Sequence, residues 1–310
     1  SAELDNLPKD DKISLVLGSI AEDRVLAKIG LDFDYVFHLA TFHGNQSSIH
    51  DPIRDHEHNT ITTLKLCEHL KNADKLKKLV YSSAGCTVAK KTYDDVAATD
   101  EDADVSLYHD SPYQISKIIG EFYGNYYWMK HNLPFVKARF QNVYGPREIL
   151  GAGKWRGTPA TIWRNVTPTF VWKSLLEEAL PLDNEGKASR DFIYVDDIVA
   201  GLIACALNGK AGEIYNLASG VETSIKTLAE TINNLTENPT PIEYKAPRPW
   251  DRSGKRFGST EKAEKELGFK SNVSLEEGLR RTIEWAKSNR DLIIKNIGKH
   301  EIFLSQSKTD

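Results

Sequence analysis

One tyrosine and one lysine stand where they could move a proton to and from a substrate. Tyr113 and Lys117 are four residues apart, so a helix would present them on one face. A phenol with a pKa near 10 is a poor base at neutral pH, but a neighbouring ammonium group favours the phenolate. Lowering that pKa by ~3 units requires about 4 kcal/mol of differential stabilisation. The pair is therefore a candidate acid/base.

A second pair with the same spacing, Tyr126 and Lys130, lies in the same predicted helix. At ~100° per residue, Tyr126 is turned by roughly 220° from Tyr113, so the two pairs cannot serve one site. Tyr126 belongs to an aromatic stretch that is typical of a core or of a dimer contact. The spacing alone does not decide which pair is catalytic.

Buried strands alternating with helices must position these residues. Apolar runs at 13–17, 35–40, 79–82 and 135–140 are typical of parallel strands buried on both faces. Asp51-Pro52 and Ser111-Pro112 are helix-start signals, and Asn132 with Pro134 marks a helix end. The pattern predicts an α/β fold, a Rossmann-like doubly wound parallel sheet.

The second half of the chain predicts a smaller α/β substrate-binding domain. A Gly- and Pro-rich loop over 151–159 is followed by strands at 192–195 and 214–217 and by helices near 224–235, 260–267 and 275–288, the last with a Ser274–Glu277 capping box. We expect a nucleotide-binding domain over 1–146 plus about 187–217. The substrate domain then covers about 147–186 plus 218–295, and 296–310 is expected to be a flexible tail.

Composition excludes several classes of protein. Forty Lys and Arg against 44 Asp and Glu leave a formal net charge of -4, which argues against a nucleic-acid-binding face. No apolar run approaches the ~20 residues needed to span a membrane. The three cysteines are too scattered for a zinc site or a disulfide framework, and no metal is expected. A cytoplasmic protein fits best.

Several motifs occur in an order that resembles the extended short-chain dehydrogenases. Within that family they are similar to nucleotide-sugar epimerases such as UDP-galactose 4-epimerase. The resemblance runs from about Lys12 to Trp285. The motifs are Val36-Phe37-His38-Leu39-Ala40, Asn59, Tyr81-Ser82-Ser83-Ala84, Ser111-Pro112-Tyr113 with Lys117, Asn142-Val143-Tyr144-Gly145-Pro146, Arg190-Asp191-Phe192-Ile193-Tyr194-Val195-Asp196 and Tyr215-Asn216-Leu217-Ala218.

The resemblance assigns roles to matching positions. Tyr113 would be the acid/base, and Lys117 its electrostatic partner and a ligand of the cofactor ribose. The cofactor would be NAD, with NADP not excluded. Further cofactor contacts would come from Ser19, Ile20, Leu39, Ala40, Thr41, Asn59, Phe140, Asn142 and Val143.

A nucleotide-diphosphate sugar would be the substrate. Asn142, Asn165 and Val166 resemble the family's contacts to it. Arg190 and Arg248 would hold the diphosphate, and Asp251 a ribose. Each of three residues has a structural alternative to substrate binding. Arg190 could form a surface ion pair, Arg248 could simply lie in a loop, and Asn142 could satisfy backbone groups at a strand end. His43 could bind the sugar or be satisfied by backbone. The resemblance also implies a homodimer through the helices near 52–71 and 112–131.

One departure concerns the hydroxyl that the family places beside the tyrosine, because Ala84 occupies that position. We expect Ser83 to substitute for it, with Thr87 or a purely structural Ser83 as alternatives. Cys86 lies where some relatives have a working thiol, and it could exchange a proton or simply pack in the interior.

A second departure concerns the beginning of the fold. No Gly-rich dinucleotide-binding turn occurs, and the run 13–17 would lack a neighbouring strand. We therefore expect roughly 40 residues of a strand-helix-strand unit to lie upstream of the sequence given. The residue that separates NAD from NADP normally lies there.

The predicted reaction is epimerisation through a transient keto-sugar. Tyr113 would take the hydroxyl proton while hydride passes to the cofactor and later returns to the other face of the sugar. Two alternatives remain: a GDP-sugar 3,5-epimerase or 4-reductase that uses Cys86, and a non-catalytic cofactor-binding homologue.

Overall fold

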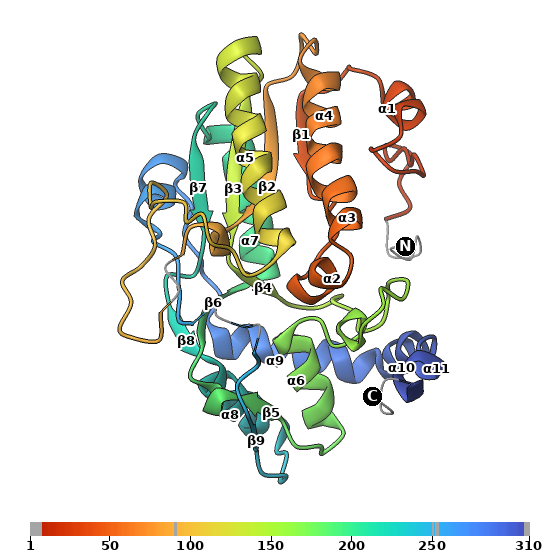
Figure 1. The fold of residues 1–310 in the computed structure, drawn as a ribbon, viewed down its shortest axis with the longest axis vertical. Helices are drawn as coiled ribbons and strands as arrows, with labels where there is room; N and C mark the ends of the chain where they lie inside the picture. The colour runs from red at the N-terminus through yellow and green to blue at the C-terminus, as the bar shows by residue number, and fades with distance from the viewer. Residues whose placement is uncertain (1–7, 90–91, 250, 252–253, 307–310) are drawn as a thin grey trace.

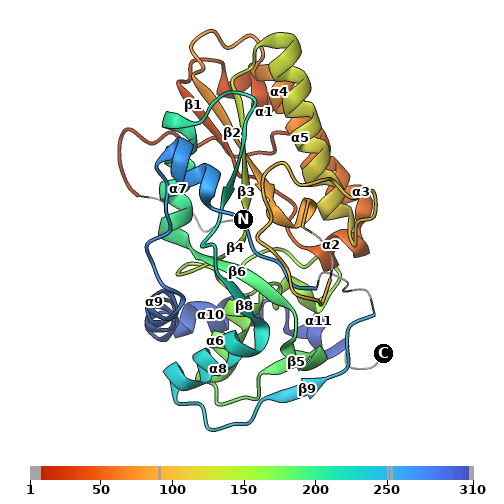
Figure 2. The same ribbon diagram turned by 90° about the vertical axis from the view of Figure 1, so that its left-hand side faces the viewer.

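The structure is a computed structural model of the 310-residue chain, and it describes residues 8–89, 92–249, 251 and 254–306. Figures 1 and 2 show two parts stacked along the long axis, a parallel sheet with helices above and a smaller α/β unit below. No helix in the described ranges is long and apolar enough to cross a bilayer.

The upper part is built on a four-stranded parallel sheet in the order β1-β2-β3-β7. The strands are β1 (Tyr35–His38), β2 (Lys78–Ala84), β3 (Phe135–Phe140) and β7 (Ile214–Leu217). β2 and β3 lie in the middle and are buried almost along their whole length. The predicted Rossmann-like fold is confirmed.

Helices cover both faces of this sheet. Figure 2 shows α4 and α5 on one face and α7 on the other. Helix α5 follows the predicted signals: Ser111 is its N-cap residue, Pro112 opens it, and left-handed Asn132 ends it. The helices of this part are α1 (Asp23–Ile29), α2 (Asn45–His50), α3 (Pro52–Asp55), the π-helical turn η2 (His56–Ile61), α4 (Thr62–Leu70), η3 (Gly85–Thr87), α5 (Pro112–His131) and α7 (Val195–Asn208).

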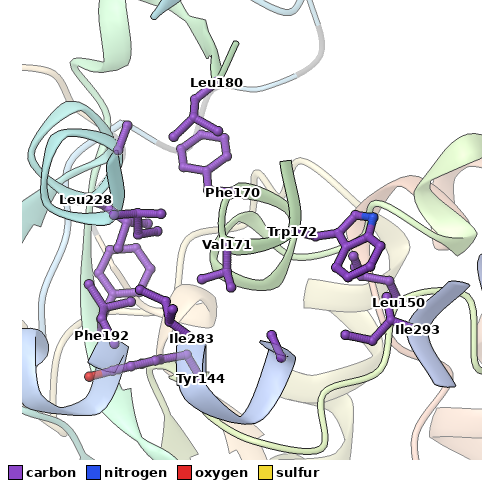
Figure 3. Packing of buried hydrophobic residues seen from close by; sticks show 14 of the residues in the cluster. Tyr144, Leu150, Phe170, Val171, Trp172, Leu180, Phe192, Leu228, Ile283 and Ile293 are labelled. Carbon is purple, nitrogen blue, oxygen red and sulfur yellow. The ribbon is translucent and has the colours of Figure 1, made fainter. Parts of the chain in front are cut away.

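The lower part has its own core between short sheets and helices. Figure 3 shows Phe170, Val171, Leu228 and Ile283 meeting from three helices, and burying such a side chain contributes about 1.5–3 kcal/mol. Its sheets are β4-β6-β8 and β5-β9. The elements are β4 (Asn142–Tyr144), η4 (Pro159–Thr161), α6 (Val166–Leu175), β5 (Pro181–Asp183), η5 (Asn184–Gly186), β6 (Ser189–Tyr194), β8 (Glu222–Ser224), α8 (Ile225–Thr236), β9 (Glu243–Lys245), α9 (Leu275–Ser288), α10 (Arg290–Gly298) and α11 (Glu301–Gln306). The π-helical turn η6 (Ala263–Leu267) packs against α7 and β7 of the upper part.

The predicted strand at 13–17 is wrong. These residues have no regular secondary structure, and the side chain of Leu17 is 72% exposed. A strand is stabilised only by hydrogen bonds to a neighbour, and this run pairs with no strand of the described chain.

The predicted flexible tail over 296–310 is also wrong for the part that the structure describes, up to residue 306. Two helices, α10 and α11, occupy it. Asn296 and His300 are buried, and the rings of Trp155 and Phe303 stack with centroids 5.0 Å apart. The His300 ring also hydrogen-bonds the backbone oxygens of Gly151 and Gly153. Because these buried anchors are polar, they do not produce the hydrophobic period by which a packed helix is predicted from sequence.

Candidate functional site

Lys117 lies beside Tyr113 at the carboxyl end of the central strands, as the spacing predicts. Its side chain is 3% exposed and its Nζ donates a hydrogen bond to the backbone oxygen of Ser82 at 2.7 Å. The ammonium lies 5.8 Å from the centre of the Tyr113 ring and 5.2 Å from that of Tyr81. Tyr113 itself is partly exposed. A buried cation thus lies next to the ring of a partly exposed tyrosine.

Without the positively charged nicotinamide, the pKa of the Tyr113 phenol is raised rather than lowered. Burial raises the pKa of Tyr113, and the nearby charges of Cys86 and Asp55 raise it further. Burial lowers the pKa of Lys117 to about 8, while Asp55 and Cys86 oppose that shift. Desolvation is thus the largest cause of both shifts.

Asn59 positions the pair rather than offering free polar atoms to a cofactor. It lies in the π-helical turn η2, where its Oδ1 accepts hydrogen bonds from Thr41 Oγ1 at 2.9 Å and from the Phe42 backbone N–H at 2.7 Å. Its Nδ2 donates to Asp55 at 2.8 Å and to Ser116 at 3.2 Å. Asn59 therefore ties the loop after β1 to the residue next to Lys117.

The contacts of Ser83 agree with the alternative in which its hydroxyl has a structural role. Its hydroxyl donates to Glu121 at 2.5 Å, and Glu121 forms an ion pair with Arg139 at 2.8 Å in which both side chains are 3% exposed. The alternative Thr87 donates to the backbone oxygen of Ala84 at 2.8 Å. No local pattern indicates this buried network, because its members come from β2, β3 and α5.

His43 lies against Tyr113. The rings of His43 and Tyr113 meet edge to face with centroids 5.7 Å apart. Burial lowers the pKa of His43 to about 3, and the charges of Arg164, Lys117 and Arg156 lower it further. Its Nδ1 is buried and, within the described chain, has no hydrogen-bond partner. The imidazole is therefore neutral and keeps an unused polar atom beside Tyr113.

Cys86 links this centre to the predicted diphosphate residue Arg190. The thiol is partly exposed in η3 and acts electrostatically on Tyr113, Lys117 and Arg190. Arg190 is buried in β6, where Nη1 donates to the backbone oxygens of Ser189 and Gly254 at 2.6 Å each. Burial lowers its pKa to about 9, Arg256 lowers it further, and Asp251 opposes the shift. The structure thus brings Arg190 and Asp251 together at this site.

The remaining substrate candidates come from two other segments. Arg248 forms an ion pair with Asp183 at 2.5 Å, with its side chain about half exposed. Asn165 is the N-cap residue of α6 without a capping hydrogen bond, and its side chain donates to Glu148 instead. Val166 begins that helix, so the first backbone N–H groups of α6 are not capped by Asn165 and suit an anion.

The remaining cofactor candidates fall into two groups. Leu39 and Ala40 are exposed after β1, and Phe140, Asn142 and Val143 are partly exposed around the end of β3. All five follow or end strands at the sheet edge where ligands bind in such folds. Ser19 and Ile20 lie apart, in the turn before α1, and Ile20 packs against the core under α4.

Fold and site together define a nucleotide-binding enzyme of the short-chain dehydrogenase type. The profile of the NAD dependent epimerase/dehydratase family matches residues 2–218, and the chain belongs to this family.

Two solved structures and one curated protein illustrate the similarity to individual relatives. The Bordetella bronchiseptica enzyme WbmF in complex with NAD+ and UDP is 55% identical, with a TM-score of 0.87 over 98% of this chain and 87% of that one. The Thermotoga maritima UDP-glucose 4-epimerase with UDP-glucose is 29% identical, with a TM-score of 0.79 over 88% and 84%. The UDP-glucose 4-epimerase of Mycolicibacterium smegmatis is 28% identical over 92% and 86% of the two chains.

Proposed function

We propose that the chain is an NAD-dependent epimerase that inverts a hydroxyl-bearing carbon of a UDP-linked sugar. The observation that carries this proposal is the buried ammonium of Lys117 next to the ring of the partly exposed Tyr113 at the strand ends. The WbmF structure with NAD+ and UDP supports the choice of nucleotide and cofactor.

The residues at the strand ends fit a nicotinamide cofactor. Lys117 has three N–H donors, and within the described chain only the Ser82 oxygen accepts a hydrogen bond from it, so donors remain for ribose hydroxyls. Leu39 is 47% exposed at the end of β1 and offers an apolar surface for a ring system. When bound, NAD accepts a hydride from the sugar carbon and returns it.

Tyr113 and Lys117 supply the proton chemistry. The Tyr113 oxygen takes the proton of the sugar hydroxyl as that carbon is oxidised, and it returns the proton after the sugar has turned. Lys117 stabilises the negative charge on the phenolate, because no other cation lies as close to the Tyr113 ring in the described structure. Arg190 and the start of α6 hold the diphosphate while the sugar moves.

A second candidate function uses Cys86 as an additional acid/base in a GDP-keto-sugar epimerase. The electrostatic proximity of Cys86 to both Tyr113 and Lys117 favours it. Cys86→Ser separates the two functions, because loss of the thiol should be mild for hydride-based epimerisation. It should be severe where the thiol itself moves a proton.

Tyr113→Phe tests the proposed function. Removing the acid/base should lower turnover of a UDP-sugar by about 10²- to 10⁴-fold while calorimetric binding of UDP stays within a few-fold. Tyr123→Phe, on the same helix, is the matched control. Turnover by the Tyr113 variant at the rate of the control would overturn the proposal.

We also propose that the enzyme works as a homodimer through the helices at 52–71 and 112–131. Helix α5 presents an exposed apolar stripe consisting of Ile115, Phe122, Tyr126 and Met129, of which Phe122 is 55% and Met129 69% exposed. The spacing of seven, four and three residues puts them on one helix face, and such a patch is typical of an interface. Light scattering of Phe122→Asp should report a monomer if the proposal holds.

A further inference from the structure

Three guanidinium groups surround the loop that carries His43. Arg54 comes from α3, and Arg156 and Arg164 come from the long connection between β4 and α6. Nη1 of Arg156 donates to the backbone oxygen of His43 at 3.1 Å. The Cζ atoms of Arg156 and Arg54 lie 4.6 and 5.9 Å from the centre of the same Phe42 ring.

No carboxylate of the described chain is paired directly with these cations, although Glu148 attracts Arg164 electrostatically. Within the described ranges, none of the three guanidiniums forms an ion pair or a hydrogen bond with an acidic side chain. Two carboxylates lie in the region, but Asp55 is hydrogen-bonded to Asn59 and Glu148 to Asn165. Burial raises the pKa of both carboxyl groups, while the Asn165 hydrogen bond and the charge of Arg164 oppose that shift at Glu148.

The connection between β4 and α6 is held in place at Arg156 and at the next residue, Gly157. The backbone N–H of Arg156 donates to Thr161 Oγ1 at 3.0 Å. Gly157 has φ +88°, and a Cβ atom there would lie 2.0 Å from Nε2 of His50, so the chain passes tightly over α2. Arg156 is therefore pre-organised, although clustering like charges is unfavourable without an anion.

We propose that the sugar bound against Tyr113 carries a carboxylate, which Arg156 binds with the help of Arg54 and Arg164. The substrate class is then a nucleotide-linked uronic acid. This inference rests on the proposed function and specifies its substrate. A guanidinium suits a carboxylate because its parallel N–H groups match the two oxygens.

The position of the cluster favours the sugar over the diphosphate as its ligand. Arg156 donates to the backbone oxygen of His43, whose ring lies against Tyr113, so this cation lies near the place where the reacting sugar ring must sit. Arg190 and the N-terminus of α6 are the groups suited to the diphosphate. In the described chain, Nδ1 of His43 also has no hydrogen-bond partner, so it is a second polar group near Tyr113 that a sugar could contact.

The test compares UDP-glucuronate with UDP-glucose on the NAD-loaded protein, by calorimetric binding and by NMR detection of the 4-epimer. The wild-type protein should bind and turn over the uronate at least about tenfold better, as expected for a charge-assisted hydrogen bond. Arg156→Gln should lower kcat/KM for the uronate by about 10- to 100-fold and leave UDP-glucose within about twofold. Arg280→Gln, which removes an exposed Arg paired with Glu276 on α9, is the matched control.

The outcomes separate this inference from the proposed function. Equal affinity for the two sugars, or an Arg156→Gln variant that loses both equally, would overturn the carboxylate and assign the cluster to the diphosphate. Preferential uronate binding without epimerisation would support the carboxylate and count against the epimerase.

Discussion

Replacing Lys117 by Met removes the charge that stabilises the Tyr113 phenolate and keeps much of the side-chain volume. With the ammonium 5.8 Å from the ring centre and an effective dielectric constant of about 20, the attraction is about 3 kcal/mol. That energy corresponds to about 2 pKa units on the phenol. The kcat of the variant should therefore be about 100-fold lower at pH 7. The pH at which its activity increases should be higher than in the wild type.

The assay is a pH–rate profile of UDP-sugar epimerisation on NAD-loaded protein. Lys130→Met is the matched control, because Lys130 belongs to the second Tyr-x-x-x-Lys pair on an exposed face of the same helix. It should leave the profile unchanged. A Lys117→Met protein that is folded, keeps kcat within twofold and has an unshifted profile would refute the reasoning.

The other predictions concern stability and the loop over the site. Because the pKa of Lys117 is about 8 in the fold and 10.5 as the ordinary value, the unfolded chain binds more protons between these values. The difference in unfolding free energy between the wild type and Lys117→Met should therefore increase, in favour of the wild type, by about 2 kcal/mol from pH 8 to pH 10. Urea titrations at the two pH values measure this difference. Ser83→Ala should lower the unfolding free energy by about 1–3 kcal/mol through its lost bond to Glu121, with kcat nearly unchanged. A large loss of kcat in stable protein would return Ser83 to the chemistry. His300→Ala should release the backbone of Gly151 and raise KM several-fold more than it changes kcat, and an unchanged KM would contradict this.

The sequence predicted those elements whose signals are local. The limits of β3 and β7 agree with the apolar runs at 135–140 and 214–217, because both strands are buried and are flanked by polar or turn residues. Helix α5 begins and ends at its predicted signals. The four-residue spacing placed Tyr113 and Lys117 together, since helix geometry alone determines that contact.

The sequence did not predict features that depend on distant neighbours. The run 13–17 has strand-forming residues, but pairing decides whether a strand forms. Ser83 reads as a free hydroxyl until Glu121 is brought opposite it by α5. Arg156 reads as a loop residue, and only the tight passage at Gly157 brings it over His43. Burial at the site, which reverses the pKa shift expected for Tyr113, likewise comes from the whole fold.

Solvent isotope incorporation tests the central claim most directly. If Tyr113 moves only the hydroxyl proton while the carbon-bound hydrogen leaves and returns as hydride, epimerisation in D₂O should give a product with no deuterium on the inverted carbon. Mass spectrometry and NMR of the sugar nucleotide measure this. Deuterium on that carbon at one atom per turnover would contradict the account, because it would mean that the carbon itself is deprotonated.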